Sequence, residues 1–118
     1  MSKIQLSPLV NFQGRAREAL AFYQKVLGGQ LDLQALRLES DGGQILASDG
    51  HPDYPAKVGD NMAIALAGTD RVRLSKIFNE LADGGKIKGP LTKQAGGGEV
   101  GWLMDKFGVN WMVSIDMA

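Results

Sequence analysis

The sequence contains no cysteine, and this absence excludes several kinds of chemistry at once. Without a thiol the chain can form no disulfide, hold no metal through thiolates and use no cysteine nucleophile. Histidine is almost as scarce, since His51 is the only one.

A surplus of charge and long apolar runs are also lacking. Thirteen Lys and Arg residues balance thirteen Asp and Glu residues, which argues against a nucleic-acid or anionic-membrane partner and favours self-association. No apolar run approaches the ~18 residues of a membrane span, and the first residues lead into a strand pattern, not into a signal peptide. We therefore expect a cytoplasmic protein, with residues 1–118 forming a single domain.

Glycine is abundant, with 16 residues, and its placement divides the chain into two similar halves, about 1–57 and 58–118. Gly28-Gly29 and Gly84-Gly85 each follow an amphipathic stretch with helical spacing, at residues 16–27 and 74–81. We expect Asp70 to cap the start of the second helix and the double glycines to end both helices through positive φ.

Alternating apolar residues predict a strand before each helix, over residues 4–12 and 61–67. Further strand patterns follow each helix, at residues 30–39, 43–49, 86–93, 99–105 and 109–116. Each half therefore reads as strand, helix and then two or three strands, which predicts an α+β fold with one sheet face under a helix.

The opposite sheet faces are predicted to carry small or polar side chains. A solvent-facing sheet would normally carry Lys, Glu, Thr and Arg there, so short side chains indicate the wall of a ligand cavity. The alternatives are a plain surface and a contact with a partner subunit. The expected ligand contacts are Ser7, Asn11, Asn61, Asn110, Met112 and Ser114. Trp111 alternates with Val113 and Ile115, and we expect both Trp111 and Trp102 in the core and not against a ligand.

Several short motifs are similar to one known family. These are FQG at 12–14, EALAFY at 18–23, LGG at 27–29, LASD at 46–49 and DKFGVNWMV at 105–113. They resemble the PhnB-like proteins of the vicinal oxygen chelate superfamily, which also includes glyoxalase, bleomycin-resistance and extradiol-dioxygenase proteins. The resemblance implies two βαβββ modules forming a cupped, mostly antiparallel sheet with helices on the outer face, usually in a homodimer.

The resemblance also implies where a metal would bind in active members, which use three or four His, Glu or Gln side chains. The corresponding positions fall at Ser7, Asn61 and Met112, with Asp49 near the fourth. Ser, Asn and Met are poor ligands for Zn²⁺ or Fe²⁺. We therefore expect no metal site and no cofactor, although a divalent metal held by Asp49, His51 and Glu99 stays an alternative.

Those three residues are also the candidates for catalysis. His51 lies in a loop rich in glycine and proline, where it could act as a general base tuned by Asp49 or Asp53, or be an exposed imidazole. Tyr54 in the same loop could cover a ligand. Glu99 follows three glycines and could place a carboxylate at the cavity mouth, or simply begin a solvated strand.

These observations favour a small-molecule-binding protein of the superfamily that lacks the usual metal site. One alternative is a metal-dependent lyase, isomerase or dioxygenase with a displaced site, so enzymatic activity stays open. The other is a dimeric assembly module. A methyltransferase activity is disfavoured, because no glycine-rich turn joins a first strand to its helix to hold a nucleoside cofactor.

Overall fold

A computed structural model describes residues 4–40, 42–53 and 55–117. The chain divides into two compact units, Met1–Lys57 and Val58–Ala118.

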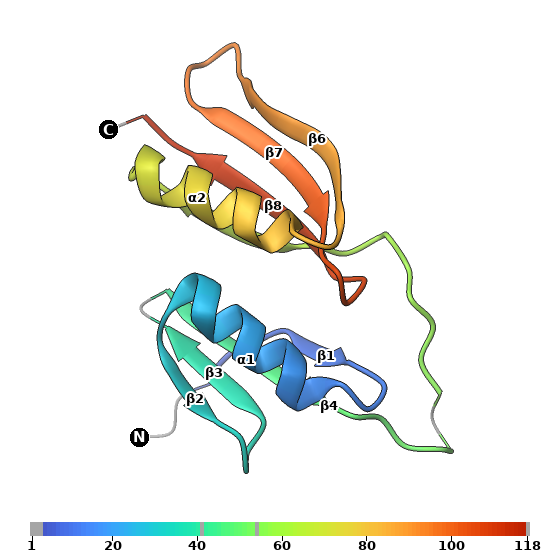
Figure 1. Cartoon of the computed structure of the whole chain (residues 1–118). Helices are drawn as coiled ribbons and strands as arrows, with labels where there is room; N and C mark the ends of the chain where they lie inside the picture. Colours follow the sequence, from blue (N-terminus) through green and yellow to red (C-terminus); the bar gives the residue numbers. More distant parts are fainter. Residues whose placement is uncertain (1–3, 41, 54, 118) are drawn as a thin grey trace. The chain divides into compact units, whose positions relative to one another are not determined.

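The first unit is a four-stranded sheet with one helix. Its elements are β1 (Leu9–Asn11), α1 (Ala16–Leu27), β2 (Gln30–Asp32), β3 (Arg37–Ser40) and β4 (Gly43–Ser48). The strand order is β1-β4-β3-β2, in which β1 runs parallel to β4 and the other neighbours are antiparallel (Figure 1).

The second unit repeats this arrangement. Its elements are β5 (Ile64–Gly68), α2 (Arg71–Ala82), β6 (Lys86–Lys93), β7 (Glu99–Met104) and β8 (Asn110–Ile115). The strand order β5-β8-β7-β6, with β5 parallel to β8, matches that of the first sheet. The predicted α+β class and the two βαβββ modules are confirmed.

Each helix packs on one face of the sheet in its own module. Helical spacing on the helix and period-two spacing on the strands bring apolar side chains together between them. In the second module the buried set is Leu74, Ile77, Phe78, Leu81, Leu103, Trp111, Val113 and Ile115. Gly101 of β7 allows this close packing, because a Cβ there would lie 2.6 Å from the Phe78 ring.

The glycine pairs act at the ends of the helices, as predicted. Gly28 is the C-cap of α1 with φ 77°, and Gly84 has φ 79°, although the C-cap of α2 is Asp83. The second glycine of each pair allows a close approach to a strand, because a Cβ on Gly29 would overlap the carbonyl oxygen of Glu39. A Cβ on Gly85 would overlap the carbonyl oxygen of Met104 in the same way.

The first strand is shorter than predicted. It begins at Leu9, and Ile4 and Leu6 are fully exposed instead of lying under the helix. The parallel register places Leu9 beside Leu46, so β4, which begins at Gly43, offers no partner to Ile4.

Two other strand predictions also need correction. The stretch 30–39 is divided by a turn, in which the Asp32 carboxylate accepts the backbone N–H groups of Gln34 and Ala35. In the second module the strand begins at Ile64, not at residue 61. Among the described residues, neither helix is long and apolar enough to cross a membrane.

Candidate functional site

A cavity of about 340 Å³ lies on the face of the second sheet that is opposite α2. The segment ahead of β5 lines it, together with residues from all four strands of the module. We call it the module-2 cavity.

Apolar side chains form its floor. The strand register places Ala65, Met112, Trp102 and Gly89 beside one another across the four strands. Alanine leaves space above the sheet, and Gly89 leaves the edge of the indole uncovered, since a Cβ there would lie 3.5 Å from Trp102 Cδ1. Trp102 is consequently 48% exposed and presents an aromatic surface to the cavity.

Polar groups gather around Asn110 at one side of this cavity. Asn110 is only 9% exposed, and its side-chain amide donates to the carbonyl oxygen of Gly59 at 3.2 Å. Its Oδ1 accepts a hydrogen bond from Lys88 Nζ at 3.0 Å. The two bonds hold the amide in one orientation and bring a lysine ammonium to the cavity wall, while Asp60 and Asn61 line it from the preceding loop.

The exposed indole corrects the sequence-based prediction for Trp102. Trp111 is fully buried as expected, and its Nε1–H donates to Asp105 Oδ2 at 2.8 Å. Along β7, however, Gly101 and Leu103 are buried while Trp102 points to the other face. In the sequence, Val100, Trp102 and Met104 share one face as large apolar residues, which favoured the core for Trp102, so only the structure places its indole at the cavity.

Lys88 was also missed, and here the sequence carries no clear signal. An isolated lysine in a strand is usually a solvated side chain. Moreover, the pairing of β6 with β7 shifts between Ile87 and Gly89, so simple alternation does not predict the direction of Lys88.

The six predicted ligand contacts fall in different places. Asn61, Asn110 and Met112 line the module-2 cavity. Ser114 lies further along the same face of β8, where its hydroxyl donates to Asp116 at 2.8 Å. Ser7 and Asn11 belong to the first unit.

The open face of the first sheet is more charged than the sequence predicted. Ser7 accepts a hydrogen bond from Gln44 at 2.8 Å, and Asn11 Oδ1 accepts the backbone N–H of Gln13 at 2.9 Å. Arg37 of β3 lies 3.4 Å from a carboxylate oxygen of Glu39 and 3.9 Å from one of Asp32. This face is therefore not lined by short side chains alone.

The candidate catalytic residues are engaged elsewhere in the fold. Asp49 Oδ1 accepts the backbone N–H of Ala16 at 2.7 Å, so its carboxylate caps the first turn of α1. Glu99 forms an ion pair with Arg71 in the first turn of α2. It therefore reaches toward the helix and not toward a cavity mouth on the opposite face.

His51 lies in an exposed loop. Its Nδ1 accepts the backbone N–H of Asp53 at 3.1 Å, and 60% of the side chain is exposed. Tyr54 lies outside the described residues. Within residues 4–40, 42–53 and 55–117, no three His, Cys, Asp or Glu side chains are grouped so that they could hold a metal ion. Asp49 and Glu99 are each held by a partner within their own unit.

Comparison with known proteins agrees with the fold. Residues 30–114 match the protein family described as 3-demethylubiquinone-9 3-methyltransferase. Protein PA1353 from Pseudomonas aeruginosa is similar in structure, with a TM-score of 0.90 and 29% identity over 98% of this chain and 100% of that one. No curated protein matches the sequence.

Two more distant structures share the fold. The PhnB protein from Bacillus cereus, which carries the same methyltransferase description, has a TM-score of 0.73 and 21% identity over 98% of this chain and 100% of that one. A glyoxalase/bleomycin resistance protein from Albidiferax ferrireducens has a TM-score of 0.67 and 18% identity over 94% and 96%. The chain therefore belongs to the family described as 3-demethylubiquinone-9 3-methyltransferase, a PhnB-like family of the vicinal oxygen chelate superfamily.

Proposed function

We propose that the protein binds a small molecule in the module-2 cavity without the metal that active members of the superfamily use. The observation that carries this proposal is the combination of an apolar floor with one oriented polar group, Asn110. Small-molecule sites in proteins have this composition, mostly apolar with a few placed polar groups.

The size and order of the cavity support the proposal. Its volume of about 340 Å³ is at the lower end of the range for ligand pockets, about 300–1,000 Å³. Asn110 is already held by Gly59 and Lys88, so a ligand would not need to order this side chain on binding. Such preorganisation lowers the entropic cost of association.

The donor set supports binding without a metal. Asn61 and Met112 stand at two of the positions expected for metal ligands and both line the cavity, but an amide and a thioether are poor partners for Zn²⁺. Asp49, the best remaining donor, is held by the N-terminus of α1.

The fold also favours binding over methyl transfer, despite the family description. A nucleoside cofactor in a doubly wound fold sits at a glycine-rich turn between a strand and the start of a helix. Here each strand-to-helix connection has a single glycine, Gly14 before α1 and Gly68 before α2, whereas the glycine pairs 28–29 and 84–85 follow the ends of helices.

The two tryptophans provide a direct test. In a ¹H–¹⁵N NMR spectrum, the indole N–H of Trp102 should report on the cavity, whereas that of Trp111 is buried on Asp105 and should report on the fold. A screen of small aromatic and aliphatic compounds should yield ligands that shift the Trp102 signal and leave the Trp111 signal in place. Trp102→Phe would assign the two signals.

The same NMR screen can overturn the proposal. If no compound shifted the Trp102 signal, or if the shifts of bound compounds mapped to other parts of the chain, the module-2 cavity would not be the ligand site.

A further inference from the structure

The ammonium group of Lys88 is available to a ligand. The ion pairs among the described residues involve Arg15, Arg37, His51 and Arg71, and none involves Lys88. Its hydrogen bond goes to a neutral acceptor, Asn110 Oδ1. A lysine has three N–H donors, so the bond to Asn110 positions the positive charge at the cavity wall and leaves donors for another acceptor.

Aromatic and sulfur-containing side chains line the same cavity. Trp102 exposes about half of its surface, and Met62 and Met112 contribute two thioethers. Flat aromatic groups stack on indole rings, and methionine sulfur makes favourable contacts with aromatic rings. Ala63 and Ala65 add no bulk that would prevent a ring from reaching this surface.

We infer that the ligand of the module-2 cavity is a planar aromatic carboxylate, whose ring lies against Trp102 and whose carboxylate binds Lys88. This inference rests on the proposed function and adds the chemical class of the ligand. A single lysine balances the single negative charge of a carboxylate, whereas a phosphate carries about −1.5 to −2 charges at pH 7.

Asp60 is the acidic residue of the cavity lining and opposes this preference. It lies on the segment ahead of β5 and forms no ion pair with Lys88 within 4.0 Å. Because a like charge disfavours an anion, Asp60→Asn should strengthen the binding of an aromatic carboxylate.

The test compares three probes, namely 2-naphthoate, its neutral amide 2-naphthamide, which removes the charge, and decalin-2-carboxylate, which keeps the two rings but is saturated and not flat. Dissociation constants would be measured by NMR titration of the full chain, with the Trp111 indole signal as a check of the fold. We expect 2-naphthoate to bind most tightly. Added NaCl should weaken the binding of 2-naphthoate and leave the binding of the neutral 2-naphthamide unchanged.

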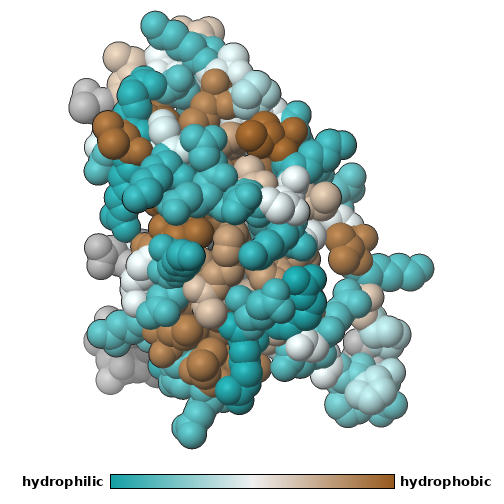
Figure 2. Space-filling model, in the orientation of Figure 1, coloured by the Kyte–Doolittle hydropathy of each residue, from teal (hydrophilic) through white to brown (hydrophobic). Residues whose placement is uncertain are grey.

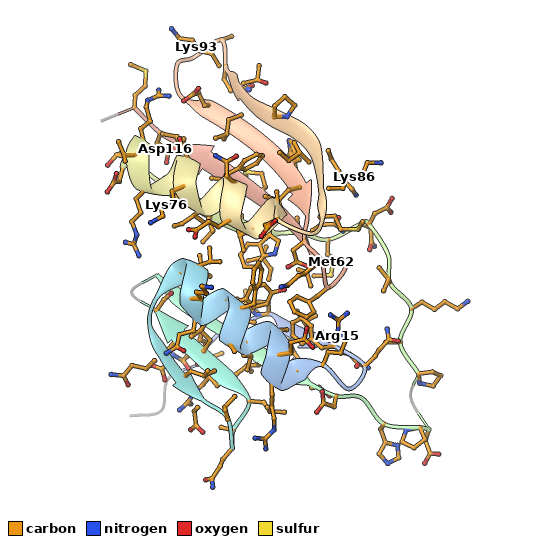
Figure 3. The ribbon with its side chains drawn as sticks, viewed as in Figure 1. Arg15, Met62, Lys76, Lys86, Lys93 and Asp116 are labelled. Atoms are coloured by element: carbon orange, nitrogen blue, oxygen red, sulfur yellow. The ribbon has the colours of Figure 1, made fainter. Side chains whose placement is uncertain are left out.

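The matched variants are Lys88→Gln and Lys93→Gln. Both remove one positive charge from β6, but Lys93 lies at the far end of the strand and does not line the cavity (Figure 3). Lys88→Gln should weaken 2-naphthoate by about three- to tenfold and leave 2-naphthamide unchanged, and Lys93→Gln should change neither. Trp102→Leu should weaken both naphthyl probes by about two- to tenfold.

Different results would refute the class of ligand and the cavity itself. Equal binding of 2-naphthoate and 2-naphthamide through Trp102, or equal effects of Lys88→Gln and Lys93→Gln, would overturn the aromatic carboxylate and leave a neutral-ligand cavity. Equal or tighter binding of decalin-2-carboxylate than of 2-naphthoate would overturn the role of Trp102. If none of these probes and no compound of the screen shifted the Trp102 signal, the cavity itself would be refuted as a site.

Discussion

Asp49 lies near a position expected for a metal ligand, but its carboxylate caps the first turn of α1. The N-cap position of α1 is occupied by Arg15, which makes no side-chain capping bond. Asp49, 33 residues away in sequence, supplies the missing acceptor to Ala16. In the second module a residue close in sequence caps the helix, because the side chain of Asp70, the N-cap of α2, accepts the backbone N–H of Arg73 at 3.1 Å.

We predict that Asp49→Ala lowers the free energy of unfolding by about 0.5–2 kcal/mol, the usual cost of losing an N-terminal cap. Urea unfolding followed by circular dichroism would measure this change. Asp53→Ala is the matched control, because Asp53 belongs to the same loop and 79% of its side chain is exposed. Equal midpoints for the two variants would show that Asp49 does not stabilise the helix.

In both modules a pair of glycines connects the helix to the strand that follows it. Each pair of glycines combines a residue with positive φ and a residue whose missing Cβ lets the chain pass close to a neighbouring strand. Gly85 isolates the second effect, since its φ is not in the left-handed region and a Cβ there would still meet the backbone of Met104 and Asp105.

We predict that Gly85→Ala is much more destabilising than Gly84→Ala. Gly84→Ala should cost about 1–2 kcal/mol, the penalty of a left-handed conformation, because a Cβ there meets the movable side chain of Lys106. Gly85→Ala forces two backbone segments apart and should cost more than about 3 kcal/mol. Thermal unfolding of both variants would compare them, and a smaller loss for Gly85→Ala would contradict the steric role.

At the scale of the whole molecule, the chain combines a neutral net charge with a polar exterior interrupted by apolar side chains. Figure 2 shows hydrophilic side chains over most of the visible face, with hydrophobic ones between them. The donor inventory of the chain as a whole is poor for transition metals, since it has one histidine and no cysteine.

We predict that the protein purified without chelator carries far less than one divalent metal per chain by mass spectrometry, and that EDTA leaves its melting temperature unchanged. A bound structural metal would raise that temperature through linkage. Near-stoichiometric Zn, Mn, Ni or Fe would contradict the proposed metal-free site, and variants of Asp49, His51 and Glu99 would then identify the ligands.

Much of the architecture followed from local pattern. The spacing of apolar residues predicted both helices, and the strands of the second module were placed to within three residues at each end. Gly28 and Asp70 marked helix ends correctly, because caps depend on residues close in sequence, and Gly84 lies one residue beyond the C-cap of α2. The resemblance to PhnB-like proteins, carried by five short motifs, added the two-module topology.

Part of the candidate site could also be predicted. Asn110 and Met112 were placed on the open face by alternation alone, since neighbouring residues of a strand point to opposite sides. Asn61 also lines the cavity, but from the loop ahead of β5, where the alternation that predicted it does not apply. Trp102 was misassigned because a large aromatic residue that alternates with Val100 and Met104 was expected in the core, whereas the structure buries Gly101 and Leu103 instead.

By itself, then, the sequence determined both helices, most of the strands and the scarcity of metal ligands, because these depend on composition and on short periods. Only the tertiary structure decided that Lys88 meets Asn110, that Asp49 caps a helix 33 residues away and that Glu99 pairs with Arg71. The physical reason is that side-chain partners distant in sequence are chosen by strand register and bulges, as at Ile87 and Gly89, which local pattern does not specify.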